Sequence, residues 1–205
     1  MYLYMLPLSA SSPSAAGAPS SKHAHVIPAP THDGGLEHTA ASFEDASAWL
    51  ARCRAGEITL YPPQYYLMSL IEQFTSEAPA AASSAASHYG SQREALLRFL
   101  KRTPTVREGA DARAQGHATA SIPWAEKVMS PSVLFMRSSD RRVVLALDKP
   151  GPELSGSKRG GDYDRVVLVQ FKKDGPQGLE LTWRDEAVAE QRAAEKIQEQ
   201  KDAKL

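Results

Sequence analysis

The side chains best suited to chemistry in this sequence lie near its N-terminus. His32, Asp33, Glu37 and His38 form its only group of imidazoles and carboxylates. Both kinds of group bind divalent metals, and a neutral imidazole can also act as a general base. Asp33 and Glu37 are therefore candidate metal ligands. The alternative is that Asp33-Gly34-Gly35 is a turn leading into a strand, on which Glu37 and His38 would point to opposite faces.

A second group of chemically capable residues is the basic, glycine-rich stretch Gly156–Asp162. Its backbone N–H groups and the cations of Lys158 and Arg159 could bind a phosphate. The stretch lacks the Gly-Lys-Ser/Thr order of a P-loop, and no helical pattern follows it. A hairpin connection between Leu147 and Arg165 explains the same glycines. Lys158 and Arg159 are thus candidate substrate-binding residues, with a plain connecting loop as the alternative.

The composition argues against several classes of protein. Lys plus Arg and Asp plus Glu number 24 each, so charge gives no reason to expect nucleic acid or an anionic membrane as a partner. The single cysteine, Cys53, excludes an intramolecular disulfide and a cysteine-rich zinc site. No apolar stretch approaches the ~20 residues that span a bilayer. The sequence also contains no Gly-x-Ser-x-Gly nucleophile elbow.

The elements expected in the first 104 residues are strands and helices separated by segments of small residues. Met1–Leu8 alternates like a strand, and Leu36–Ala41 is a second predicted strand. Ser9–Pro30 is rich in Ser, Ala and Pro and is predicted to be a flexible loop. Residues 78–87 are predicted to be a linker. Because a strand at the first residue has no lead-in, we expect a segment to be missing upstream of Met1.

Helices are predicted over Phe43–Ala55 and Ser91–Arg102. Ser42 and Asp45 resemble a capping box at the start of the first helix, and Gly56 ends it. Trp49 and Leu50 lie on its apolar face. The second helix has its apolar residues on one face, and Pro104 follows its end.

The segment Gly56–Ile71 carries the most information about local structure. A short β-branched run is followed at once by Pro62 and Pro63. Proline lacks an N–H and has a fixed φ, so it is tolerated only in the first turn of a helix. We therefore predict a strand, a sharp turn and a helix. One face of that helix carries Tyr66, Leu67, Leu70, Ile71 and Phe74.

The last third of the chain is predicted to be rich in strands. Alternating or continuous apolar runs between turn signals mark four strands, Val133–Arg137, Arg142–Leu147, Arg165–Phe171 and Leu179–Trp183. A charged helix with few apolar positions, Arg184–Lys201, follows and is expected to be half docked and half solvated.

Four segments of the sequence resemble the rear portion of Nudix hydrolases, and in particular the peroxisomal coenzyme A diphosphatase-like branch with its fungal relatives. These segments are Met1–Leu8 (MYLYMLPL), Thr31–Thr39 (THDGGLEHT), Ser42–Trp49 and Gly56–Leu70. The resemblance covers about the first 75 residues. It implies metal-dependent hydrolysis of a diphosphate bond in coenzyme A or its acyl esters, with Mg or Mn as the metal.

The catalytic signature of that family is absent from the sequence. The signature places Arg-Glu-x-x-Glu-Glu on a helix, where the carboxylates hold a divalent metal against the diphosphate. Here Arg93-Glu94 is followed by Ala and Leu, without a second carboxylate pair. Asp185, Glu186 and Glu190 have nearly helical spacing but lack the preceding glycine and glutamate, so we interpret them as a solvated helix face. We therefore expect a catalytically incomplete relative, with no supported catalytic residue.

The C-terminal tripeptide Ala203-Lys204-Leu205 is a variant of the Ser-Lys-Leu peroxisomal address. An import receptor would recognise the terminal carboxylate, the lysine charge and the leucine. We therefore expect a peroxisomal protein, with a cytoplasmic location as the alternative.

Together these patterns predict an α+β protein with a mixed sheet and flanking helices. Residues 1–104 form a partial Nudix-like domain, 105–121 a mobile linker, 122–184 a β-rich extension, and 185–205 a charged helix with the targeting tail. The main functional hypothesis is a truncated Nudix hydrolase-like protein. The alternative is a non-enzymatic peroxisomal adaptor or a binding protein for a coenzyme A-type ligand.

Overall fold

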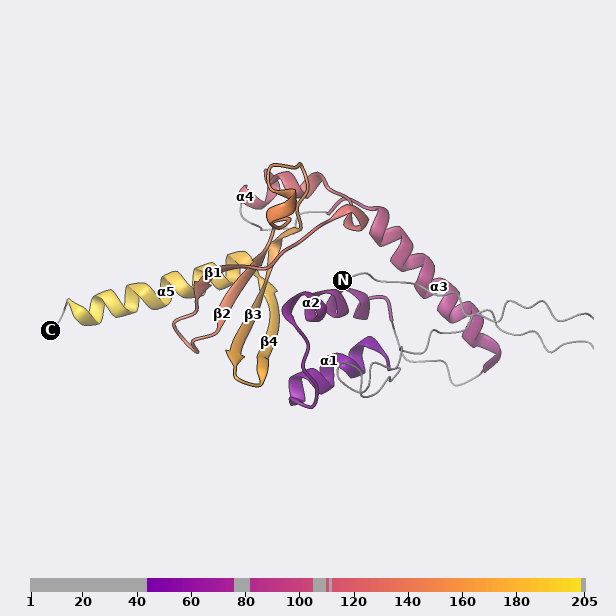
Figure 1. The fold of residues 1–205 in the computed structure, drawn as a ribbon, viewed down its shortest axis with the longest axis horizontal. Coiled ribbons are helices and arrows are strands. Elements are labelled where there is room, and N and C mark those ends of the chain that lie inside the picture. The colour runs from indigo at the N-terminus through magenta and orange to yellow at the C-terminus, as the bar shows by residue number, and fades with distance from the viewer. Residues whose placement is uncertain (1–43, 76–81, 105–109, 111, 204–205) are drawn as a thin grey trace, which may run out of the picture.

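The structure, a computed structural model, describes residues 44–75, 82–104, 110 and 112–203 (Figure 1). Its longer helices are α1 (Ala46–Ala55), α2 (Pro62–Glu72), α3 (Ala82–Lys101) and α5 (Arg184–Asp202), with the short α4 (Ala112–Gln115) between them. Its strands are β1 (Ser132–Met136), β2 (Val143–Leu147), β3 (Asp162–Lys172) and β4 (Gly175–Trp183). The predictions for Met1–Leu8, Ser9–Pro30 and Leu36–Ala41 lie outside the described residues. This mixture of helices with one sheet is an α+β architecture.

The four strands form one sheet in the order β1-β2-β3-β4. Every neighbouring pair is antiparallel, so the described sheet is an antiparallel meander instead of the expected mixed sheet. The reason lies in the connections, because each strand is joined to the next by a hairpin or a loop without a crossover helix. All four strands predicted in the last third of the chain are confirmed, with β3 and β4 longer than expected.

Helices α1 and α2 cover one face of this sheet. Leu50 and Tyr66, both fully buried, pack in one cluster with Leu147, Val167 and Val169 of the strands. The alternation of side chains along a strand places these three strand residues on the same face. The prolines at the start of α2 and Gly56 at the end of α1 take the predicted positions. Within the described residues, the region expected as a Nudix-like domain therefore shares its core with the region expected as an extension.

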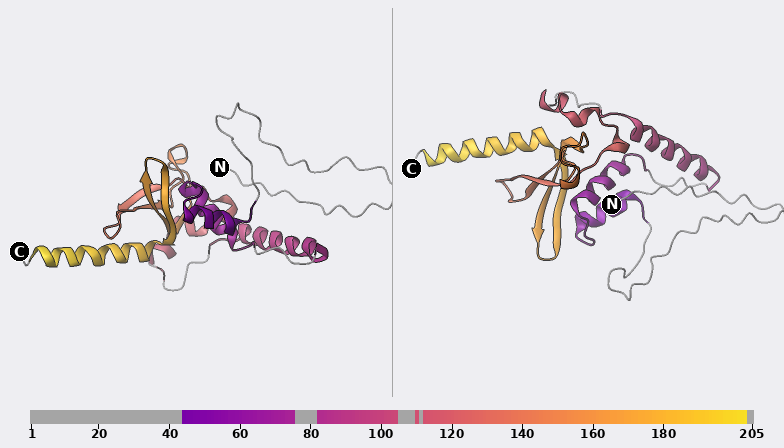
Figure 2. Two further views of the ribbon diagram at one scale, coloured as in Figure 1. Left: turned by 90° about the horizontal axis from the view of Figure 1, so that it is seen from below. Right: turned by 45° about the horizontal axis from the view of Figure 1, so that its top comes forward.

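The other face of the sheet packs against the start of α5. Val144, Val166 and Leu168 form a second buried cluster with Ala187 of the helix. Beyond this contact α5 projects away from the sheet, in the opposite direction to α3 (Figures 1 and 2). The expectation of a half-docked, half-solvated helix is therefore met.

No helix among the described residues is long and apolar enough to cross a membrane.

Three sequence predictions differ from the structure in their extent. Helix α3 begins at Ala82, inside the expected linker 78–87, because alanine is the strongest helix former and a run of it extends a helix. The expected linker 105–121 contains α4 and a 3-10 helix over Ala118–Ser121. The β-branched run after Gly56 is irregular, with no paired strand among the described residues, and its Thr59 packs against Gly175.

Candidate functional site

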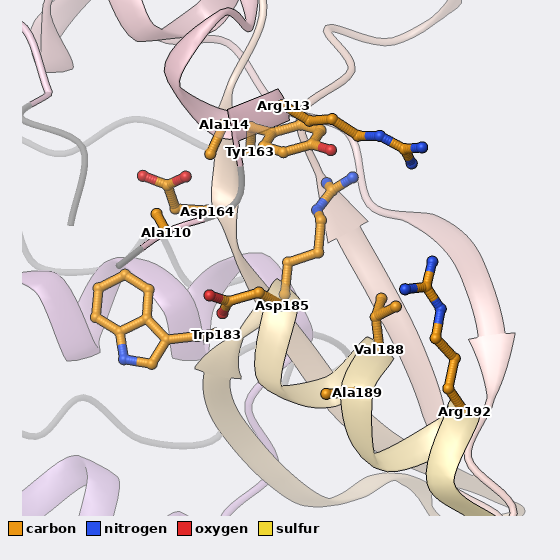
Figure 3. Close-up of a pocket in the computed structure, with 11 residues that line it drawn as sticks. Ala110, Arg113, Ala114, Tyr163, Asp164, Trp183, Asp185, Val188, Ala189 and Arg192 are labelled. Carbon is orange, nitrogen blue, oxygen red and sulfur yellow. The ribbon is translucent and has the colours of Figure 1, made fainter. Parts of the chain in front are cut away.

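A pocket of about 170 Å³ lies where α4, β3 and the first turns of α5 meet (Figure 3). Three arginines line it, Arg113 of α4 and Arg184 and Arg192 of α5, and we call it the arginine pocket. Tyr163 and Asp164 of β3 complete one side. In the view of Figure 3, the guanidinium groups of Arg113 and Arg192 lie on one side of the pocket, and the Asp164 carboxylate on the other.

The direct passage from β4 into α5 positions most of these side chains. Trp183 is the last residue of the strand and also the N-cap of the helix, with φ −80° and ψ 140°. Arg184, Val188 and Arg192 then follow at intervals of four residues, which places them along one face of a helix. Because β4 pairs with β3, with Trp183 opposite Arg165, this helix face begins beside Tyr163 and Asp164.

The Arg184 side chain is held in a fixed position. Its Nη2 donates a hydrogen bond of 2.7 Å to Asp148 Oδ1, and its guanidinium lies 4.0 Å above the centre of the Tyr163 ring. Both members of the ion pair are largely buried, with 13% and 14% of their side chains exposed. The Nε atom of Arg184 is buried without a hydrogen-bond partner among the described residues. A buried donor of this kind is rare in folded proteins.

The Tyr163 ring also contacts an imidazole. His117 stacks on it with a centroid distance of 4.2 Å and an interplanar angle of 24°. His117 Nδ1 accepts a hydrogen bond from the Thr119 backbone N–H, which assigns the other ring nitrogen as the one that can carry a proton in the neutral ring. Burial lowers the His117 pKa, so a neutral imidazole is favoured in the stack.

A buried ion pair supports the start of β3. The Tyr66 hydroxyl donates to Asp162 Oδ2 at 2.7 Å, and Arg165 Nη1 donates to the same oxygen at 3.1 Å. The Asp164 backbone N–H donates to Oδ1 of Asp162 at 2.9 Å. Burial, together with the neighbouring Asp162 charge, raises the Tyr66 pKa well above its usual value. These bonds fix the backbone that carries Tyr163 and Asp164.

Lys127 connects two other segments near the pocket. Its Nζ donates to the backbone carbonyls of Thr119 at 2.8 Å and Gly161 at 2.7 Å. Burial lowers the Lys127 pKa, while the charges of Asp162 and Asp164 oppose that change. With both acceptors on the backbone, we assign Lys127 a structural role between the 3-10 helix at 118–121 and β3.

Asp164 differs from Asp162 because the cations near it, Arg165 and Lys127, offset its charge only in part and without a hydrogen bond. Its half-buried carboxylate has no hydrogen-bond or ion-pair partner among the described residues. Burial is the largest cause that raises its pKa, and the charge of Asp162 adds to it. An ionised carboxylate at this position is therefore stabilised less than it is in water.

We expect Asp164→Asn to increase the stability of the protein at neutral pH. A raised pKa means that the folded state binds more protons than the unfolded state, so ionised Asp164 lowers the free energy of unfolding above its folded pKa. That penalty disappears as the pH falls through the folded pKa. Urea unfolding of both proteins at several pH values should show a gain at pH 7 that shrinks toward acidic pH. A constant difference at every pH would contradict this assignment.

The candidate residues expected from the sequence fall partly outside and partly inside the described ranges. Asp33 and Glu37 lie outside the described residues, as do Lys204 and Leu205. Lys158 and Arg159 lie in an exposed loop between β2 and β3 and do not line the arginine pocket. Within the described ranges, no group of three His, Cys, Asp or Glu side chains could hold a metal ion.

The acidic residues of α5 occupy a largely solvated face, as expected, with one exception. Glu186 and Glu190 are exposed, and Glu190 accepts a hydrogen bond of 3.3 Å from Arg137. Asp185 lines the arginine pocket.

Sequence analysis missed Arg113, Arg184 and Arg192. The last two are spaced by eight residues on one helix face, which was a signal available in the sequence.

Comparisons with protein-family models, with curated proteins and with solved structures found no match to this chain.

Proposed function

We propose that this chain binds a small molecule through an anionic group, a phosphate or a carboxylate, in the arginine pocket. The observation that carries the proposal is that three guanidinium groups, those of Arg113, Arg184 and Arg192, belong to the lining of one pocket. Asp148 and Tyr163 hold the guanidinium of Arg184 in place. Hydrogen bonds between guanidinium groups and anions are among the strongest in proteins.

Two further features of the pocket support an anionic ligand. Arg113 and Arg192 lie on the same side of it, and Arg192 has no ion-pair partner in the part of the chain that the structure describes. The pocket also opens at the N-terminal turn of α5, where the helix dipole favours negative charge. Its volume, about 170 Å³, is below the roughly 300–1,000 Å³ of drug-sized sites. It therefore suits a small ligand, or the charged end of a longer one.

We expect Arg192→Ala to weaken the binding of an anionic ligand about tenfold. This is the loss expected from one charge-assisted hydrogen bond of about 1.5 kcal/mol. Arg192 is exposed, so the substitution should leave the free energy of unfolding unchanged. Isothermal titration calorimetry with inorganic phosphate, ethyl phosphate and coenzyme A measures the effect.

The matched control is the double variant Lys158→Ala/Arg159→Ala. It also removes exposed positive charge, but from a loop that does not line the pocket. We expect its affinity for the same anions to equal that of the unaltered protein. If the loop variant lost binding and Arg192→Ala did not, the anion site would lie in the glycine-rich loop. If the unaltered protein bound none of these anions, the proposed function would be wrong.

A relationship to Nudix coenzyme A diphosphatases is a second proposal. The segments Thr31–Thr39 and Gly56–Leu70 support it. Under this proposal the chain is a catalytically incomplete relative, and coenzyme A is the ligand whose charged end the arginine pocket would bind. The test is an assay of the purified chain on acyl-coenzyme A with Mg²⁺ or Mn²⁺. Binding without turnover supports an incomplete relative, and metal-dependent turnover would contradict it.

Peroxisomal import through Ala203-Lys204-Leu205 is proposed on the sequence of that tripeptide alone. A fluorescent fusion ending in this tail should accumulate in peroxisomes, and the same fusion without Leu205 should remain in the cytoplasm.

A further inference from the structure

The arginine pocket, about 170 Å³ in volume, has groups of both charges in its lining. Arg113, Arg184 and Arg192 supply guanidinium groups, and Arg192 has no ion-pair partner among the described residues. Asp164 supplies a half-buried carboxylate that accepts no hydrogen bond from the described part of the chain. An anion alone would meet the arginines and would add no positive charge beside Asp164.

From this juxtaposition we infer that the ligand of the arginine pocket is a small zwitterion, an amine that also carries a phosphate or carboxylate. Its ammonium group pairs with Asp164, and its anionic group binds Arg184 and Arg192. The inference rests on the proposed function, because it adds a second contact to the same anion site.

The geometry of the pocket agrees with a ligand of two opposite charges. In Figure 3 the Asp164 carboxylate lies across the pocket from the guanidinium groups of Arg113 and Arg192. Asp185 lines the pocket as well and adds negative charge near Asp164. The lining also includes Ala114, Val188 and Ala189, which offer a small apolar surface that suits a short methylene chain.

The electrostatic state of Asp164 agrees with the same ligand class. Burial and the charge of Asp162 disfavour its ionised form, and the nearby cations of Arg165 and Lys127 only partly oppose this. A ligand ammonium within about 4 Å would restore the lost stabilisation of the carboxylate. A simple anion would instead meet repulsion from this side of the pocket.

The test compares ligands that differ only in the amine. Phosphoethanolamine and ethyl phosphate form one pair, and β-alanine and propionate form the other. Calorimetric titration of the full chain should show that the amine increases affinity about tenfold or more within a pair, as expected for one charge-assisted hydrogen bond. The pair that binds more tightly identifies phosphate or carboxylate as the anionic group.

Asp164→Asn is the variant that isolates the ammonium contact. It should bind the amine and the amine-free ligand of each pair with affinities within about twofold, while its affinity for ethyl phosphate should not fall. The control Lys158→Ala/Arg159→Ala should keep the preference for the amine. Equal affinities of the unaltered protein for both members of each pair would overturn the zwitterion inference and leave the anion site intact. A preference for the amine that survives in Asp164→Asn would also overturn it. Absence of binding by all four ligands would instead refute the proposed function.

Discussion

Asp162→Ala is expected to lower the free energy of unfolding by about 3–5 kcal/mol, the cost of removing one partner from a buried ion pair. Only 5% of the Asp162 side chain is exposed, and it accepts hydrogen bonds from Tyr66, from Arg165 and from the Asp164 backbone. Alanine would leave the Tyr66 hydroxyl and the Arg165 cation without this acceptor. Urea unfolding followed by circular dichroism measures the change.

Two further variants separate the charge from the hydrogen bonds. Asp162→Asn keeps an oxygen that can accept from Tyr66, so we expect a smaller loss of about 1–3 kcal/mol. Tyr66→Phe removes only the hydroxyl donor and should cost a similar amount. Because the two groups are in direct contact, the losses in Tyr66→Phe and Asp162→Ala should not add in the double variant. Strict additivity, or a loss below about 1 kcal/mol in Asp162→Ala, would show that this contact does not stabilise the fold.

Gly161→Ala is expected to destabilise the protein by about 3 kcal/mol or more, the upper end of the range for overpacked sites. A Cβ atom at Gly161 would collide with the Leu147 carbonyl oxygen and would lie 2.6 Å from Met129 Cβ. The first neighbour is backbone and cannot rotate away. The Gly161 N–H also donates to the Asp148 carbonyl at 3.0 Å, so a backbone shift would strain the segment that carries the Arg184 partner.

Gly90→Ala is the control, because here the same substitution is expected to raise the free energy of unfolding. Gly90 is an exposed residue within α3, and a Cβ atom there would meet nothing within 4 Å. Alanine restricts the unfolded chain and suits a helix, so we expect a gain of up to about 1 kcal/mol. Thermal unfolding of both variants is the measurement. A similar loss in the two proteins would mean that the clash at Gly161 is not the cause.

The local patterns in this sequence correctly predicted most of the described elements. Pro62 and Pro63 mark the start of α2, Gly56 lies at the end of α1 in a left-handed conformation, and apolar alternation marks the four strands. These signals depend on a residue and its near neighbours: the fixed φ of proline, the absence of a side chain in glycine, and the period at which apolar residues recur. For the same reason the sequence placed the start of α3 nine residues too late, because an alanine and serine run suits a helix as well as a linker.

The sequence did not point to the arginine pocket, because distant segments decide the environment of its residues. Lys158 and Arg159 were chosen because cations and glycines are adjacent in the sequence; they are exposed, do not line this pocket, and stay a prediction. Arg113, Tyr163 and Arg184 were not predicted as a group, because nothing local in the sequence links them. Antiparallel pairing of β3 with β4 and the direct start of α5 bring Tyr163 and Arg184 together, and α4 adds Arg113 to the pocket.

The sequence by itself determined four of the helices in outline and the four strands, since backbone preferences and hydrophobic period act over a few residues. Tertiary structure alone decided which polar groups lose water and which find partners. Tyr66 and Asp162 are 96 residues apart and share a buried hydrogen bond, while Asp164, two residues further on, has none for its carboxylate in the described part of the chain. Desolvation depends on all the segments that pack around a group, and therefore only the assembled fold could set the charge of this pocket.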